Sequence, residues 1–153
     1  MKKSIIVIIF LLALTICTSC AMSKNIIRSG SGDLVIECTI KGLFTDEYNN
    51  KTNFIRLYDD KTIGTGTNDK IDNKYDVNPD DYQKIINYAF SPDFINLKED
   101  LSDKRVADGS IQYITIYFED GSSKKIGGAN PSNRKFQKLY KMLNEVVEKG
   151  EEE

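Results

Sequence analysis

Two amphipathic stretches constrain the fold of this chain more than any other feature of its sequence. The first lies within residues 78–90 and places on one helical face Tyr82, Ile85, Ile86, Ala89 and Phe90. The second lies near the C-terminus and aligns Phe136, Leu139, Tyr140, Leu143, Val146 and Val147. Neither helix can bury its apolar stripe alone, so both must pack against another layer.

Residues suited to helix ends set the predicted boundaries of both helices. Asn78 is a good N-cap before Pro79, and Ser91-Pro92 ends the first helix. Asn130-Pro131 repeats this chemistry and predicts the start of the second helix, which Gly150 is expected to end. The two starts suggest a repeated hairpin–helix unit. A true duplication and the shared demands of turns and caps explain this likeness equally well.

Segments rich in β-branched and aromatic residues supply the other layer. The predicted strands are residues 33–43, 54–58, 62–65, 111–118 and 123–126. Asp-Gly within residues 119–122 predicts a hairpin turn, Gly127-Gly128 is expected to break the last strand, and the Asp/Asn-rich residues 68–78 predict a loop. The sequence therefore predicts an α+β fold, with about five antiparallel strands and two helices on one face, in the order β-ββ-α-ββ-α.

The N-terminus carries the features of an export signal. Lys2 and Lys3 precede an apolar run over residues 5–17, which is shorter than the roughly 20 residues of a membrane-spanning helix. Small residues, Thr18 and Ser19, follow directly. A charged start, a short apolar run and small residues together predict a signal peptide over residues 1–19.

Thr18-Ser19-Cys20 after an apolar run resembles the lipobox of bacterial lipoproteins. The resemblance implies that the Cys20 thiol receives a diacylglyceryl group and becomes the first residue of the mature chain. The family usually has Leu three positions before this cysteine, where this chain has Cys17. Residues 20–32 are then a lipid anchor and tether, residues 33–150 a single domain, and residues 151–153 an acidic tail.

The order of elements also looks similar to domains of unknown function in secreted bacterial lipoproteins. The likeness covers about residues 33–148 and depends on pattern, with Phe94 after the first helix and Asp120-Gly121 in the late hairpin. It implies a fold and carries no activity. Both resemblances place the chain in the bacterial cell envelope, on the extracytoplasmic side of a membrane, held by acyl chains such as palmitate in membrane lipid.

The composition of the chain excludes several kinds of active site. The chain has no His, so catalytic triads and metal sites that need an imidazole are excluded. Loss of Lys2 and Lys3 would take the net charge from −2 to −4, and an exported chain of that charge is not expected to bind nucleic acid. Cys38 alternates with Leu34, Ile36 and Ile40, which is typical of a core residue and not of a nucleophile.

Three groups of side chains are candidates for a functional surface. Tyr58, Tyr113 and Tyr117 are predicted to share the sheet face that no helix covers. A basic patch is the second candidate, against the alternative of an ordinary solvated surface; it comprises Lys124, Lys125, Arg134, Lys138 and Lys141. The acidic loop within residues 59–81 could hold calcium but lacks EF-hand spacing, so no metal site and no cofactor is predicted.

These observations favour a non-enzymatic binding or envelope-interaction module, with an unknown protein or glycan as partner. An inhibitor or accessory subunit of another exported protein is the second hypothesis. An enzyme that uses carboxylates alone is the third, and it is disfavoured because the acids cluster in turns and helix starts.

Overall fold

The computed structural model describes residues 30–42, 51–105 and 109–152. The predicted signal peptide, Cys20 and most of the tether lie outside these ranges. The elements, in chain order, are β1 (Leu34–Gly42), β2 (Thr52–Tyr58), β3 (Thr62–Thr67), β4 (Lys70–Asp76), α2 (Pro79–Ala89), α3 (Pro92–Ile95), β5 (Ser110–Tyr117), β6 (Ser123–Ala129) and α4 (Arg134–Glu152).

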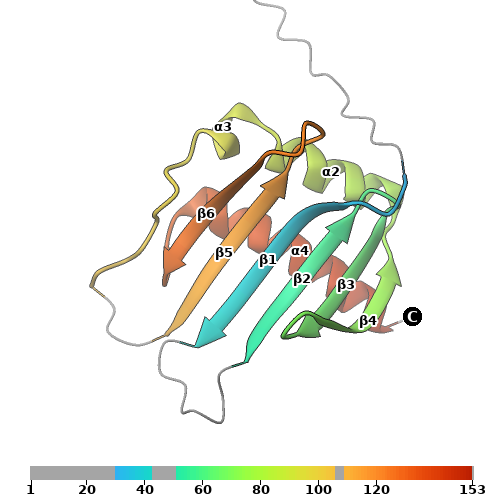
Figure 1. The fold of residues 1–153 in the computed structure, drawn as a ribbon, viewed down its shortest axis with the longest axis horizontal. Coiled ribbons are helices and arrows are strands. Elements are labelled where there is room, and N and C mark those ends of the chain that lie inside the picture. Colours follow the sequence, from blue (N-terminus) through green and yellow to red (C-terminus); the bar gives the residue numbers. More distant parts are fainter. Residues whose placement is uncertain (1–29, 43–50, 106–108, 153) are drawn as a thin grey trace, which may run out of the picture.

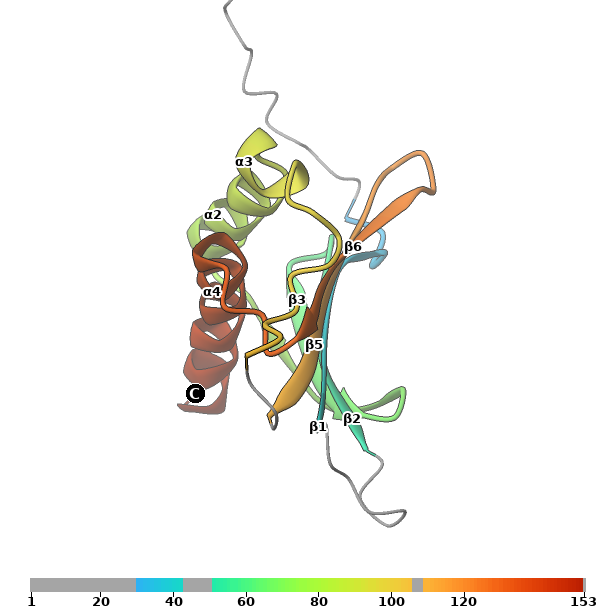
Figure 2. The same cartoon turned by 90° about the vertical axis from the view of Figure 1, so that its left-hand side faces the viewer.

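All six strands form one antiparallel sheet in the order β4-β3-β2-β1-β5-β6 (Figure 1). The three helices lie on a single face of this sheet, and the opposite face carries no helix (Figure 2). The prediction of an α+β fold with helices on one side is therefore confirmed. The predicted numbers of about five strands and two helices were too low. The described residues form six strands and three helices in the order β-βββ-α-α-ββ-α.

The strand that sequence reasoning took for a loop is β4, which lies at the edge of the sheet. It pairs only with β3, and six of its seven residues are exposed. An edge strand with little burial needs no apolar alternation, so its sequence of Lys, Asp and Asn gives no strand signal. Asn68 and Asp69 take positive φ angles of 49° and 68° in the tight turn that joins it to β3.

Helix α4 differs from its predicted boundaries at both ends. The Asn133 side chain accepts hydrogen bonds from the backbone N–H groups of Lys135 and Phe136, so Asn133, not Asn130, caps the helix. Asn130 has a φ of 49°, and its side-chain oxygen accepts from the Ser110 N–H. The helix also continues through Gly150 to Glu152, so the start of the predicted tail is helical.

A continuous apolar core lies between the helices and the sheet. The sheet contributes Ile36, Leu57, Ile63, Ile114, Ile116 and Ile126, and the helices contribute Ile85, Ile86, Phe94, Phe136, Leu139 and Leu143, all fully or almost fully buried. Cys38 belongs to the same core, as its alternation predicts, and burial raises the pKa of its thiol to about 12. A thiol with that pKa stays protonated at neutral pH and is a poor nucleophile.

The two edges of the sheet are protected in different ways. At β6, the Gly127 N–H donates to Glu99 O, the Leu101 N–H to Gly127 O and the Asp103 N–H to Ala129 O. The connection before β5 therefore covers this edge with a short parallel ladder, and β6 runs through Gly127-Gly128 to Ala129 instead of ending there. At β4, alternating charged side chains discourage pairing with another chain.

Candidate functional site

The candidate site is the face of the sheet that carries no helix, here called the helix-free face. Ile114 and Ile116 point into the core, so strand alternation sends Tyr113, Thr115 and Tyr117 to the other side. Leu57 is buried in the same core, which places Tyr58 on that side as well. The structure thus brings the three predicted tyrosines to one face, all half-buried.

The register of the strands arranges this face in rows. Thr115 pairs with Glu37, Glu37 with Arg56, and Arg56 with Gly64, which faces Lys74 across β3 and β4. In the next row Tyr113 pairs with Thr39 and Thr39 with Phe54. A row that holds the charged side chains of Glu37, Arg56 and Lys74, here called the charged row, therefore runs across five strands beside a row that holds Tyr113 and Phe54.

Three aromatic side chains of this face, Phe54, Tyr58 and Tyr113, lie under a cation. The Arg56 guanidinium carbon is 4.0 Å from the Phe54 ring centroid, and Lys125 Nζ is 4.2 Å from that of Tyr113. Lys74 Nζ is 5.2 Å from the Tyr58 ring. These are cation–π distances, so the face presents paired rings and cations rather than bare apolar surface.

Arg56 is the electrostatic centre of the face. Its Nε lies 2.7 Å from Glu37 Oε1, and its Nη2 lies 2.9 Å from Asp69 Oδ1. Partial burial opposes the charged form, but hydrogen bonds to Glu37 and Asp69 outweigh it and raise the pKa of Arg56. The Tyr117 hydroxyl is 3.5 Å from Glu37 Oε2, and burial together with this carboxylate raises the pKa of Tyr117.

A small polar hollow of about 280 Å³ opens beside Arg56. It is lined by Glu37, Thr39, Thr52, Phe54, Arg56, Asn68 and Asp69. Hydroxyl, amide, carboxylate and guanidinium groups thus meet in one depression, which suits a polar side chain of a partner.

Of the two glycines on β3, only Gly66 is required by its neighbours. A Cβ atom on Gly66 would lie 2.6 Å from Phe54 Cζ and 1.9 Å from Lys70 O, so only glycine fits there. A Cβ on Gly64 would be 3.6 Å from the Tyr58 ring, an ordinary contact. Gly66 is therefore required by the close approach of the Lys70 carbonyl on β4 and of the Phe54 ring.

The predicted basic residues do not gather on one surface. Lys124 and Lys125 are successive residues of β6 and point to opposite faces. The Lys124 ammonium donates to Ile95 O in the helical layer, whereas Lys125 lies over Tyr113 on the helix-free face. Arg134, Lys138 and Lys141 lie on α4, on the far side of the sheet (Figure 2).

Sequence reasoning missed the charged row and Phe54. The alternation of Phe54, Arg56 and Tyr58 along β2 carries the signal that could have found them, since it assigns all three to the face opposite Leu57. Within the described ranges, no group of three or more Cys, Asp or Glu side chains is placed to hold a metal ion.

Comparisons with known proteins assign no function to this chain. No protein-family model, curated protein or solved structure matches the chain. Among the residues that the structure describes, none of the helices is long and apolar enough to cross a membrane.

Proposed function

We propose that this chain is a lipid-anchored binding module on the extracytoplasmic side of the bacterial cell envelope, and that its helix-free face binds a protein partner. The observation that carries the proposal is the row of charged side chains beside rings, on a sheet face that none of the described elements covers. The partner is another envelope protein, for which this chain serves as an accessory subunit or inhibitor. The lipid anchor at Cys20 is part of the proposal and depends on the lipobox.

The composition of the face supports a protein partner. Tyr, Phe and Arg are enriched at the centres of protein interfaces, and Arg and Tyr are frequent among the residues that contribute most to affinity. Here Arg56 has a side chain only 18 % exposed and lies among Phe54, Tyr58 and Tyr117. Charges of both signs in the row give a pattern that a partner can complement.

A glycan is the less suited partner for this face. Sugars are bound by aromatic rings that offer a bare face for stacking. The rings of Phe54, Tyr58 and Tyr113 each already lie under a cation. These side chains would have to move before a sugar could stack on them.

Photo-crosslinking in intact cells tests the proposal. Tyr113 is replaced by p-azidophenylalanine, which keeps a ring at the centre of the face, and Lys141 on α4 is replaced likewise as the control. We expect a discrete protein adduct from position 113 and not from position 141. Adding Arg56→Gln should reduce the adduct by about tenfold, as expected for loss of a central interface arginine. The proposal is wrong if position 113 yields no adduct, or if both positions yield the same one.

A further inference from the structure

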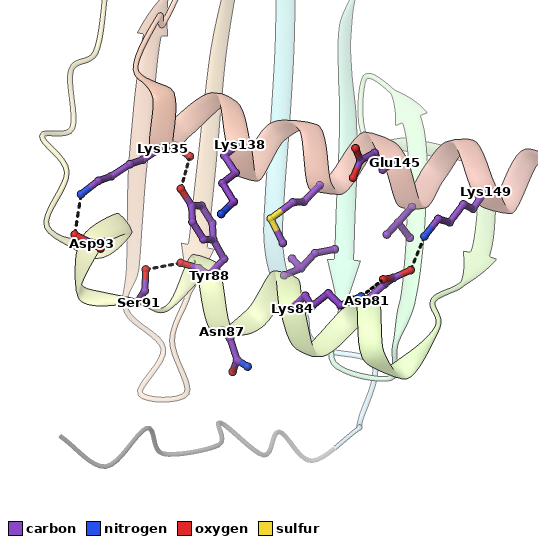
Figure 3. A pocket seen from close by; sticks show the side chains of 13 residues that line it. Asp81, Lys84, Asn87, Tyr88, Ser91, Asp93, Lys135, Lys138, Glu145 and Lys149 are labelled. Carbon is purple, nitrogen blue, oxygen red and sulfur yellow. Dashed lines mark hydrogen bonds and ion pairs between the residues drawn. The ribbon is translucent and has the colours of Figure 1, made fainter. Parts of the chain in front are cut away.

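A second cavity lies far from the helix-free face, on the outer surface of the helical layer. It is a groove of about 820 Å³ between α2 and α4, here called the interhelical groove (Figure 3). Its floor is apolar and consists of Ile85 and the Tyr88 ring from α2 with Met142 and Val146 from α4. This volume lies within the range of small-molecule sites.

Ion pairs close both ends of the groove. At one end Asp81 accepts from two lysines, with Lys149 Nζ at 2.7 Å and Lys84 Nζ at 3.0 Å. At the other end Lys135 Nζ lies 2.8 Å from Asp93, and the Tyr88 hydroxyl donates to Lys135 O (Figure 3). These lysines hold the pKa values of both carboxyl groups below their usual range, so Asp81 and Asp93 stay ionised and paired at neutral pH.

The charges that line the groove do not balance. Four lysines face three carboxylates, and the third carboxylate, Glu145, has a partner in Lys141, with 3.5 Å between Nζ and Oε1. Asp81 is shared by two lysines, which leaves one positive charge in excess at that end. Lys138 provides a second, because no carboxylate of the described residues lies within 4.0 Å of its ammonium group.

Lys138 is exposed, and its ammonium group lies beside the apolar floor. Its Nζ lies 4.6 Å from the centroid of the Tyr88 ring, in the middle of the groove. Met142 is one turn further along α4 on the same side of the helix, and Val146 is a turn beyond it. An ammonium group and a continuous apolar strip of two helical turns therefore lie in line.

We propose that the interhelical groove binds a small amphipathic carboxylate, with its charged group at Lys138 and its hydrocarbon chain along the half-buried side chains of Tyr88 and Met142. A carboxylate would supply the partner that Lys138 lacks among the described residues, in a charge-assisted contact next to apolar side chains. The chain would cover the apolar floor and release its water. This site is independent of the helix-free face and does not require the proposed protein partner.

Isothermal titration with decanoate below its micellar concentration tests the proposal on the chain as it is isolated. We expect one molecule of decanoate per chain, and binding about tenfold weaker in Lys138→Gln, the loss of one charge-assisted contact. Lys125→Gln is the matched control, because Lys125 also lies over a tyrosine ring but on the opposite face. Its decanoate affinity should equal that of the wild type.

Ligand and groove variants separate this site from unspecific binding. Decyltrimethylammonium has the same chain with the opposite charge and should not bind, and acetate should not bind because it lacks the chain. Met142→Glu places an anion on the floor and should abolish decanoate binding, with circular dichroism confirming that the variant is folded. Equal affinity of wild type and Lys138→Gln, equal binding of both decyl ions, or no binding of decanoate would each overturn the proposal.

Discussion

At the scale of single residues, Asp59 is the most constrained side chain of the described part. It is the one polar or charged residue that is buried there, at 6 % exposure, in the turn between β2 and β3. Its carboxylate accepts from the backbone N–H groups of Ser31, Gly32 and Asp33 and from the Ser31 hydroxyl. The Asp59 N–H in turn donates to Asp33 O. One carboxylate thus fixes the segment that enters β1.

The pH dependence of stability follows from these contacts. Burial alone would raise the pKa of the Asp59 carboxyl, but the hydrogen bonds outweigh it and hold the pKa below its usual range. Because the folded-state pKa is depressed, this contribution to stability is complete above the unfolded-state pKa of about 4 and is lost as pH falls through the folded-state value.

We therefore predict that Asp59→Asn lowers the free energy of unfolding by about 1–3 kcal/mol at pH 7. The difference between wild type and variant should begin to shrink below about pH 4, where the unfolded chain takes up a proton at this carboxyl, and should be lost as the pH falls through the depressed folded-state pKa. Urea denaturation at pH 7, 5, 4 and 3 measures both quantities. A difference that stays constant down to pH 3 would show that the charge of Asp59 is not what holds the Ser31–Asp33 segment.

At the scale of elements, the end of α4 shows how packing overrides a local signal. Glycine commonly follows the last residue of a helix, yet Gly150 lies inside α4. A Cβ atom there would be 2.6 Å from Cγ and 2.7 Å from Cβ of Tyr75 on β4. Gly150 is therefore the position where the helix approaches the edge strand, not the position where it ends.

A double-mutant cycle tests this assignment. Gly150→Ala should destabilise the wild type by about 1–2 kcal/mol, because the added methyl group collides with Tyr75. In a Tyr75→Gly background, which removes the ring and the Cβ atom, the same change should stabilise the protein by up to about 1 kcal/mol, because alanine is the better helix former. Urea denaturation of the four proteins gives the coupling free energy between positions 75 and 150. If Gly150→Ala changed stability in the same direction in both backgrounds, the assignment of Gly150 as a contact of Tyr75 would be wrong.

The elements that sequence reasoning predicted well are those with strong periodicity. The stripes of α2 and α4 and the alternation of β1 and β5 each have one buried face, so burial determines their residues. Strand β4 has neither face buried, and α4 is capped by Asn133 because Asn130 is needed at the Ser110 N–H. The three tyrosines followed from alternation, but the interhelical groove depends on how two helices meet, which no single segment encodes.

At the scale of the whole molecule, the topology argues against an internal duplication. The hairpins β2-β3 and β5-β6 start beside β1 and extend away from it in opposite directions. Strands β2 and β5 both run antiparallel to β1, and α2 and α4 lie on the same face (Figure 2). Two such units have opposite hands, so no rotation superposes one on the other. Shared turn and cap chemistry is then the better explanation of their similar sequences.

The same topology separates two surfaces that can act independently. The helix-free face and the interhelical groove lie on opposite sides of one rigid sheet–helix sandwich (Figures 2 and 3). The segment held by Asp59 brings the chain in at the end of the sheet where β1 begins (Figure 1). The proposed lipid anchor would be attached upstream of this end of the sheet.

The anchor itself is tested by three cysteine variants expressed in a bacterial host. Cys20→Ala should abolish incorporation of radioactive palmitate, because in the proposal this single cysteine carries the acyl chains that give firm attachment. Cys17→Ala should be labelled like the wild type, since bulky Ile16 precedes that residue and disfavours processing there. Cys38→Ala should also be labelled, because Cys38 is buried in the core. Labelling that persists in Cys20→Ala would contradict lipidation at Cys20. Loss of labelling in Cys17→Ala alone would place the lipid on Cys17 instead.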